Sequence, residues 1–284
     1  MKLSKIFALL LALCLISSAA CAATFTDAHG NVIELDDSLE AYAAVTLVGA
    51  DNAARQGETN LGDLWADALR WFAVSGEINA AFDEDDVKAG NDRIAVDADH
   101  VVALWNGGNL RADIAEGTFG AEALAEVLPF PNKVAVVYMT GAQLLETLEA
   151  ASQGLPYTVE TADACASLMQ VSGLAYTVDT TKAYDALEAY GDHWFTAGSV
   201  SRVRIDDVNG QPFDAEATYA VVTSNANFNG MDSSYVLKAA AEANEQSAVT
   251  TAVVRDVVFR FIAAELNHQV GEAYAAPQGR LTIL

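Results

Sequence analysis

Residues 101–117, VVALWNGGNLRADIAEG, join an apolar run to a glycine turn and an arginine. The run Val-Val-Ala-Leu-Trp predicts a short buried strand, which the Asn-Gly-Gly-Asn sequence at positions 106–109 ends. Glycines at such a turn let a ligand approach the backbone closely, and Arg111 offers a planar pair of donors to a phosphate or carboxylate. The stretch therefore predicts a strand that leads into a site for a small anion.

Composition limits the classes of partner. The chain has 284 residues, of which 52% are hydrophobic, so it can bury the core of one large domain or two small ones. Its formal net charge is −24, from 39 acids and 15 bases. Nucleic-acid binding needs a basic face for phosphate contacts, so we expect no nucleic-acid partner. Any phosphate-bearing ligand must be held by a local group of cations.

The first 22 residues have the order of a secretory signal peptide. Lys2 and Lys5 precede an apolar stretch and a run of small residues. Residues 20–22, Ala-Cys-Ala, fit a cleavage site, whereas residues 18–21 loosely resemble the lipobox of lipoproteins. We therefore expect export to the periplasm or the extracellular space, with a lipid anchor on Cys21 as the alternative and the only membrane attachment. Cys165 is then the one remaining thiol, and we interpret it as a small buried or semi-buried residue, with a nucleophile as the alternative.

The remaining pattern predicts an α+β domain, with a mixed or antiparallel sheet flanked by helices, over residues 45–284. Residues 23–44 form an N-terminal appendage with a short hairpin, and residues 75–92 an acidic surface loop. Thr140 and Gln143 predict a capping box that opens a helix. Asn209 and Gly210 predict a hairpin between strands 199–208 and 217–224. Further predicted elements are helices at 59–74 and 249–268 and strands at 133–139, 168–179 and 280–284.

Several polar and aromatic residues stand next to these elements. Arg55 precedes a helix start, Asn106, Gly108 and Arg111 follow a strand, Phe130 lies in LPFPN, and Asp232 follows the strand at 217–224. An aromatic side chain offers a flat face to a ring, and an aspartate accepts hydrogen bonds from hydroxyl groups. Together these residues indicate a pocket for a small anionic molecule that contains a ring.

Six blocks of sequence in order carry a family resemblance: RQGETNLGDLWADALR, VVALWNGGNLRADIAEG, EVLPFPNKVAVVYMTGAQLLETLE, LMQVSGLAYTVD, SRVRIDDVNGQPFDAEATYAVVTSNANFNGMD and GRLTIL. They closely resemble the C-terminal, substrate-binding domain of the 5′-nucleotidase family, which includes UDP-sugar hydrolases and 2′,3′-cyclic phosphodiesterases. The resemblance implies an α+β domain that grips a nucleoside. In complete enzymes it works against a separate N-terminal metallophosphatase domain that carries two metal ions.

The resemblance also implies roles for individual residues. Arg55, Asn106 and Arg111, beside Gly108, would contact the phosphate and the sugar or base. Phe130 would stack on the base, and Asp232 would accept hydrogen bonds from the ribose. The alternative for Arg111 is a bond to Asp113 or to backbone carbonyl groups, with no ligand contact.

This chain departs from the family pattern in two places. Asn109 stands where the family has a third glycine, so the turn can persist while the side chain narrows the pocket. The family's second stacking phenylalanine falls on Ala226, a loss of about 1–3 kcal/mol if base stacking has its usual value. Phe228 is a candidate substitute stacking residue, with core packing as the alternative.

The catalytic half of the family has little counterpart here. Asp27 and His29 echo a metal motif, Asp-x-His-Gly, but the later metal-ligand motifs are absent from the sequence. We therefore expect no catalytic residue, metal site or cofactor in this chain, with divalent metals confined to the missing domain. Three functions stay open: a nucleotide- or nucleoside-binding domain, alone or with a separate metallophosphatase chain; an active 5′-nucleotidase or phosphoester hydrolase; and a degenerate surface interaction module.

Overall fold

The computed structural model describes residues 24–26, 32–34, 40–82 and 94–284 of the chain. The predicted signal peptide, Asp27, His29 and residues 83–92 of the acidic loop lie outside the described residues. The predicted N-terminal hairpin is present as two antiparallel strands, β1 (Thr24–Thr26) and β2 (Val32–Glu34).

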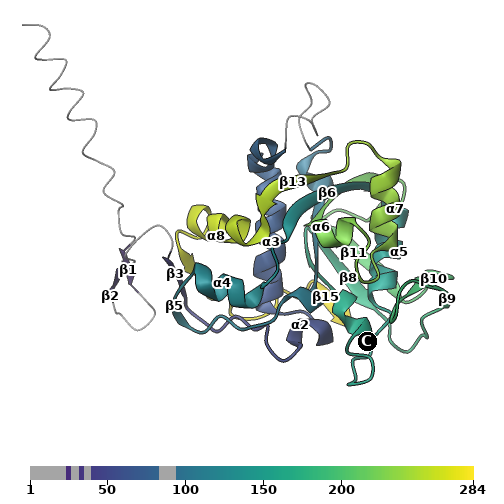
Figure 1. The fold of residues 1–284 in the computed structure, drawn as a ribbon, viewed down its shortest axis with the longest axis horizontal. Coiled ribbons are helices and arrows are strands. Elements are labelled where there is room, and N and C mark those ends of the chain that lie inside the picture. Colours follow the sequence, from purple (N-terminus) through teal and green to yellow (C-terminus); the bar gives the residue numbers. More distant parts are fainter. Residues whose placement is uncertain (1–23, 27–31, 35–39, 83–93) are drawn as a thin grey trace, which may run out of the picture.

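A five-stranded mixed sheet forms the centre of the molecule (Figure 1). In spatial order its strands are β13 (Ala248–Val253), β6 (Lys133–Thr140), β12 (Thr218–Ser224), β4 (Val101–Asn106) and β7 (Met169–Ser172). Strand β12 runs parallel to β4, and the other neighbouring pairs are antiparallel. The predicted α+β fold with a mixed sheet between helices is confirmed. Strand β4 is buried along its whole length, so both faces of the sheet are covered.

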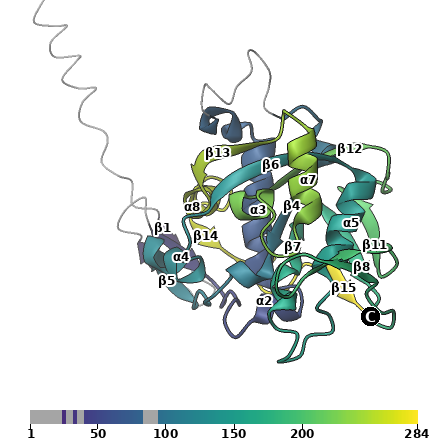
Figure 2. The ribbon, with the colours of Figure 1, turned by 45° about the vertical axis from the view of Figure 1, so that its right-hand side comes forward.

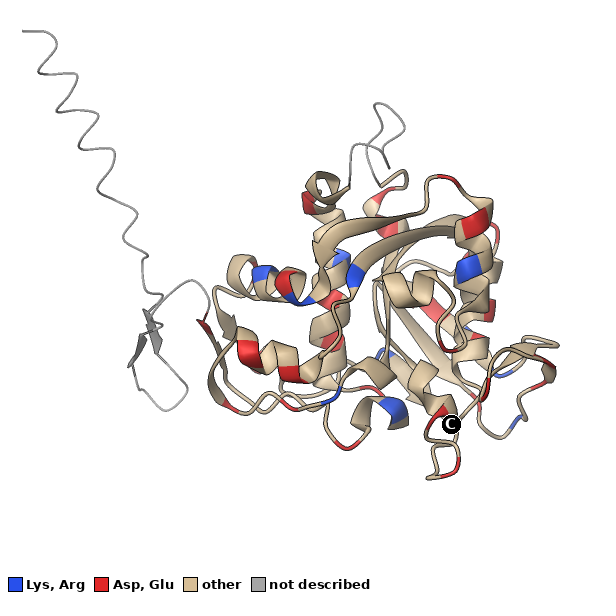
Figure 3. Cartoon of the chain, viewed as in Figure 1, with Lys and Arg blue, Asp and Glu red and all other residues tan. Residues whose placement is uncertain are grey.

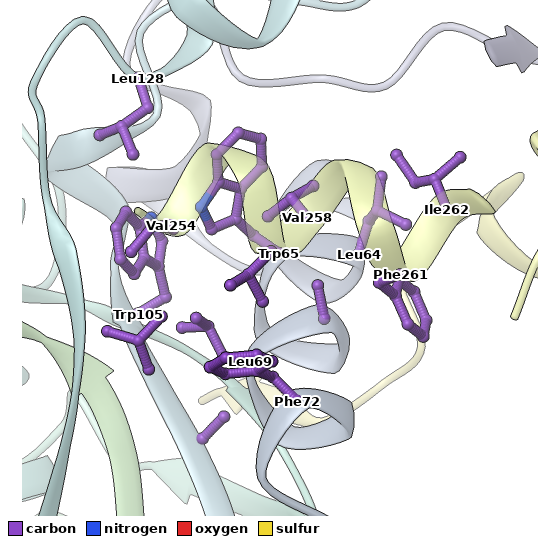
Figure 4. Packing of buried hydrophobic residues seen from close by; sticks show 14 of the residues in the cluster. Leu64, Trp65, Leu69, Phe72, Trp105, Leu128, Val254, Val258, Phe261 and Ile262 are labelled. Atoms are coloured by element: carbon purple, nitrogen blue, oxygen red, sulfur yellow. The ribbon is translucent and has the colours of Figure 1, made fainter. Parts of the chain in front are cut away.

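Helices α3 (Asn60–Val74) and α8 (Val254–Ala264) cover one face (Figure 2). Trp65 of α3 lies with its ring centroid 6.2 Å from that of Trp105 of β4, within the cluster that Figure 4 shows. The hydroxyl of Thr59 caps α3 by accepting a hydrogen bond from the Gly62 N–H at 3.0 Å. The predicted apolar face of this helix is confirmed, since all its members are buried: Leu61, Leu64, Trp65, Ala68, Leu69 and Phe72.

The opposite face packs against helices α5 (Gly141–Ala151) and α7 (Tyr235–Ala243) and a second sheet. The predicted capping box at the start of α5 is confirmed. Thr140 Oγ1 accepts from the Gln143 N–H at 3.2 Å, and Gln143 Oε1 accepts from the Thr140 N–H at 2.9 Å. In the second sheet, β8 (Leu174–Val178) lies between β11 (Val203–Val208), which is antiparallel to it, and β15 (Leu281–Ile283), which is parallel.

Smaller elements surround these layers. Strand β3 (Glu40–Ala43), within the segment predicted as an appendage, pairs with β5 (Gly117–Gly120) and β14 (Gln269–Val270). Strands β9 (Ala186–Ala189) and β10 (Phe195–Ala197) form a separate hairpin. The remaining elements are α2 (Ala53–Gln56), α4 (Ala121–Val127), α6 (Asn225–Phe228), η1 (Glu77–Ala81), η2 (Ala98–His100), η3 (Gly107–Asn109), η4 (Ala164–Ser167) and η5 (Glu272–Tyr274).

The prediction of one long helix at 249–268 is wrong. Residues up to Val253 form strand β13, and the helix α8 begins at Val254. The start of this segment is rich in β-branched residues, which suit a strand, and β13 pairs with β6. The helical periodicity therefore corresponds to a helix only from Val254 onward.

The predicted hairpin at Asn209 and Gly210 is also wrong, although the turn itself forms. Both residues have left-handed backbones, with φ of 51° and 75°. Beyond the turn, pairing continues only through an isolated bridge between Val208 and Gln211, and Pro212 follows without an N–H to donate. Strand β11 then belongs to the second sheet and β12 to the central one, so the turn connects two layers.

Acidic residues outnumber basic ones over the outer helices and loops, where lysine and arginine are few and scattered (Figure 3). Within the described residues, no helix has the length and apolar character needed to cross a bilayer.

A buried carboxyl group ties the C-terminal segment to helix α3. Asp63 is fully buried, and its Oδ2 accepts a hydrogen bond from the Gln278 N–H at 3.0 Å. Nearby, the Glu58 carboxylate accepts from the N–H groups of Arg280 and Leu281 at 3.0 and 3.1 Å. Burial and the charge of Glu58 raise the pKa of Asp63 to about 8, and Arg280 lowers it only in part.

We predict that stability depends on pH through this group. Folded protein holds the Asp63 proton to higher pH than unfolded chain, in which the carboxyl pKa is about 3.9. Its contribution to the free energy of unfolding is complete below that value and is lost as pH rises towards about 8. Urea denaturation at several pH values should show a decline that Asp63→Asn reduces, by up to about 1.4 kcal/mol per pH unit.

Asp192→Asn, which alters an exposed carboxyl group on the β9–β10 hairpin, provides the control and should leave the decline unchanged. Identical pH profiles for Asp63→Asn and the unaltered chain would contradict the prediction.

Candidate functional site

Three chain segments meet at one edge of the central sheet. Because β4 and β12 are parallel, both end at this edge, at Asn106 and Ser224. Strand β6 is antiparallel to β12 and begins there at Lys133, so the residues just before it join the same edge. The strand order therefore brings together the loops after β4 and β12, which are more than a hundred residues apart in sequence, and the segment before β6.

A cavity of about 590 Å³ lies at this edge. Its volume is within the usual range for small-molecule sites. Residues predicted as ligand contacts line it: Asn106, Gly108, Arg111, Phe130 and Asp232. The other lining residues are Asn109, Pro131, Asn132, Ala166, Asn225, Ala226, Asn229, Gly230 and Met231.

The glycine turn after β4 forms the base of the site. A Cβ atom on Gly107 would collide with the carbonyl oxygen of Ala54, and one on Gly108 would lie 2.6 Å from the Ala166 Cβ. Asn109 ends a 3₁₀ turn and does not adopt a left-handed backbone. Its side chain donates a hydrogen bond to Asn106 Oδ1 at 2.7 Å. Asn109 replaces the family's third glycine, and its amide group thus orients the side chain of Asn106.

Asn106 in turn connects the ends of the two chain segments that follow the parallel strands. Its Nδ2 donates to Asp232 Oδ2 at 2.8 Å, which joins the end of β4 to the loop after α6. Asp232 has a left-handed backbone with φ of 56°, an unusual conformation for a residue with a side chain. Burial raises the pKa of Asp232, whereas Arg55, Arg111 and the Asn106 hydrogen bond lower it.

The guanidinium group of Arg111 lies over the Phe130 ring, with Cζ 5.6 Å from the ring centroid. Its backbone N–H donates to the Val127 carbonyl, but no hydrogen bond or ion pair within the described chain engages the guanidinium itself. The Asp113 carboxylate instead accepts from the N–H groups of Gly49 and Ala50. The alternative pairing of Arg111 with Asp113 is therefore not formed.

Arg55 lies behind the cavity wall. The side chain is largely buried, and its Nη1 donates to the Ala162 carbonyl at 2.8 Å and lies 3.6 Å from Asp163 Oδ1. Although Arg55 is not among the lining residues, its charge acts on the site, lowering the pKa of both Asp232 and Arg111. The structure thus places this predicted contact beside the cavity rather than in it.

The two candidate aromatic residues occupy different environments. Phe130 is 40% exposed and lines the cavity. Phe228 packs against the core cluster on the α5 and α7 face and does not line the cavity. At the position of the family's second stacking residue, Ala226 contributes only a methyl group to the wall.

Sequence reasoning missed several lining residues, among them Asn132 and Met231. Asn132 stands two positions after Phe130, and it is a buried residue that lines the cavity. Met231 directly precedes Asp232 and is 55% exposed. Their proximity in sequence to predicted contacts was the available signal, since each lies on the same short loop as one of them.

Potential metal ligands are dispersed in the part of the chain that the structure describes. There, no group of three or more His, Cys, Asp or Glu side chains is arranged to hold a metal ion. Cys165 is buried, as predicted, and burial raises the pKa of its thiol.

The fold and the lining residues define an α+β domain with a cavity at the carboxyl ends of two parallel strands. A family model described as "5′-nucleotidase, C-terminal domain" matches residues 40–239. The chain therefore belongs to the family of 5′-nucleotidase C-terminal domains, as the sequence resemblance indicated.

Known proteins agree with this assignment. The chain is 29% identical over 188 residues to the trifunctional nucleotide phosphoesterase protein YfkN of Bacillus subtilis, a match that covers 65% of this chain and 10% of that protein. It superposes on the 5′-nucleotidase precursor of Thermus thermophilus with a TM-score of 0.61 and 25% identity, covering 99% of this chain and 42% of that one. The NAD nucleotidase of Haemophilus influenzae has the same fold, with a TM-score of 0.58 and 14% identity over 92% of this chain and 48% of that one. The chain thus spans less than half the length of each of these proteins.

We predict that the glycine turn tolerates no side chain. Gly108→Ala would push the new methyl group against Ala166, at a cost of about 1–3 kcal/mol in the free energy of unfolding. Gly271→Ala is the matched control, because no atom lies within 4 Å of its added Cβ and its backbone is not left-handed. The control should be neutral or slightly stabilising, by up to about 1 kcal/mol. Chemical denaturation measures the free energy of unfolding of both variants. An equal decrease in the two would contradict the prediction that the glycine turn tolerates no side chain.

Proposed function

We propose that this domain binds a nucleotide or nucleoside in the cavity at the edge of the central sheet and has no dimetal hydrolase centre of its own. The observation that carries the proposal is the position of Arg111. An arginine whose guanidinium makes no hydrogen bond or ion pair within the described chain lies over an exposed phenylalanine ring inside the cavity. A ligand that has both a phosphate and a ring matches this pair of groups.

The phosphate is assigned to Arg111. A chain with a net charge of −24 repels anions at long range, so attraction must come from a cation at the site itself. Arg55 adds positive potential from behind the wall, since its charge acts on both Arg111 and Asp232. A bidentate guanidinium–phosphate contact is stronger than the cation–π contact that Arg111 makes with Phe130. Phosphate binding would thus draw Arg111 from the ring and uncover it for a base.

The sugar and the base are assigned to the remaining walls. The Asp232 carboxylate, oriented by Asn106, accepts hydrogen bonds from ribose hydroxyl groups. Phe130 supplies the flat face for the base. The Asn132 amide has no hydrogen-bond partner within the described chain, so its donors and acceptor serve the edge of a ring.

Hydrolysis is the alternative function, which the names of the relatives suggest. In our proposal this chemistry belongs to a metallophosphatase domain or a separate chain that works with this one. We further propose export, supported by the signal-like order of residues 1–22, with a lipid anchor on Cys21 as the variant to test by mass spectrometry of the exported protein.

Ligand binding should raise the melting temperature. We expect a shift with millimolar AMP, adenosine or a UDP-sugar. Arg111→Ala should weaken AMP binding at least tenfold, because a hydrogen bond to a charged group is worth about 1.5–3 kcal/mol. Arg204→Ala is the control, since Arg204 is an exposed arginine paired with Asp206 on strand β11. No shift with any of these ligands would refute the proposed function.

Phosphate release tests the alternative. The purified chain, incubated with AMP and Mn²⁺, Zn²⁺ or Co²⁺, should release no more phosphate than the buffer. Turnover that a chelator abolishes and that remains after a second purification step would show an intrinsic hydrolase centre and overturn this part of the proposal.

A further inference from the structure

Met231 is the second large apolar side chain exposed in the cavity. Among the described residues that line it, Phe130 and Met231 combine a large apolar side chain with substantial exposure, at 40% and 55%. They come from different segments, the loop before β6 and the loop after α6. A single exposed apolar residue is common on a protein surface, whereas two that line the same cavity supply the apolar walls typical of a ligand pocket.

The backbone around Met231 is held firmly in place. The residues on both sides have left-handed conformations, Gly230 with φ of 87° and Asp232 with φ of 56°. The Met231 N–H donates to the Ala226 carbonyl at 3.0 Å, and its carbonyl accepts from the Ser234 N–H at 3.2 Å. A residue so constrained presents its side chain in a defined direction, whereas the methionine side chain itself stays adaptable.

A tyrosine from the β9–β10 hairpin fixes this loop from outside. The Tyr190 hydroxyl donates to the Gly230 carbonyl at 2.9 Å, and a Cβ on Gly230 would collide with that hydroxyl oxygen. The Tyr190 ring also contacts the Tyr235 ring, with centroids 5.6 Å apart. The Tyr235 hydroxyl is itself bonded to Glu146 of α5. The loop that carries Met231 is therefore tied to the body of the domain through Tyr190.

We propose that Met231 is the second wall of the ring site, against which a base resting on Phe130 packs, and that Tyr190 is the positioning residue for that wall. This inference rests on the proposed function. At Ala226 the cavity wall has only a methyl group, which leaves space for the unbranched thioether of Met231. Thioether groups make favourable contacts with aromatic rings and adapt to rings of different size. The cavity thus holds a base between one aromatic and one flexible apolar side chain.

Two probes separate the ring contact from the rest of the site. AMP carries a base, whereas ribose 5-phosphate keeps the sugar and phosphate alone. Met231→Ala should weaken AMP binding several-fold, up to about tenfold, which is the range for one thioether–ring contact, and should leave ribose 5-phosphate binding unchanged. Arg111→Ala should weaken both. Calorimetric titration of each variant measures these affinities.

The outcomes distinguish this inference from the proposed function. Unaltered AMP affinity in Met231→Ala, together with a loss in Arg111→Ala, would overturn the role of Met231 and keep the nucleotide site. Absence of binding of both probes to the unaltered chain would refute both. Equal weakening of AMP and ribose 5-phosphate in Met231→Ala would show that the loop, and not the ring contact, was changed.

Methionine oxidation gives an independent measurement on the full chain. Met139 and Met169 are buried, so dilute hydrogen peroxide should oxidise Met231 much faster than either. AMP should slow formation of the Met231 sulfoxide, as measured by peptide mass spectrometry, and ribose 5-phosphate should not. The oxidised protein should bind AMP more weakly and recover after treatment with methionine sulfoxide reductase. An oxidation rate that AMP does not alter would overturn the proposal.

Tyr190→Phe tests the positioning role, because it keeps the ring and removes the bond to Gly230. We expect several-fold weaker AMP binding, and a smaller effect of the same change in the Met231→Ala background. Equal effects in the two backgrounds would show that Tyr190 does not act through Met231.

Discussion

The parallel pairing of β4 with β12 is the constraint on which the site depends. Parallel strands end at the same edge of a sheet, so the turn at Asn106 and the loop to Asp232 emerge side by side. The side-chain hydrogen bond between these two residues can form only because the strands are neighbours. Strand β6 is antiparallel to β12 and begins at the same edge, so Phe130, which lies just before β6, is placed there too. One strand order thus assembles a cation, a carboxylate and a ring from three loops.

Much of the fold follows from local patterns that the sequence displays. The apolar face of α3, the capping box at Thr140 and the buried run of β4 depend on neighbours in the chain, so they are predictable from short windows. The incorrect prediction of a hairpin at Asn209 shows the limit of local patterns. The turn signal was correct, but strand partners are chosen by packing between layers, which a local signal does not contain.

The same distinction applies to the site. Residue types on loops next to strands indicated five of the fourteen lining residues, because ligand-binding groups cluster on such loops. Burial is a property of the assembled fold, and it separates the remaining candidates. Arg55 is buried outside the cavity lining, and Phe228 packs against the core, although Phe228 directly precedes the lining residue Asn229. Met231 was missed because a methionine indicates no ligand chemistry by its residue type, and its position next to Asp232 was the only signal.

The walls of the cavity differ in rigidity, and this difference affects ligand specificity under the proposed function. The glycine turn is packed directly against Ala54 and Ala166, so it has no freedom to adapt. The facing loop is held by its backbone and by Tyr190, while its exposed side chain is the most flexible apolar type. A rigid polar wall fixes the position of the charged and hydroxyl groups of a ligand. An adaptable apolar wall accepts rings of more than one shape, so under the proposed function discrimination would rest on the sugar and phosphate more than on the base.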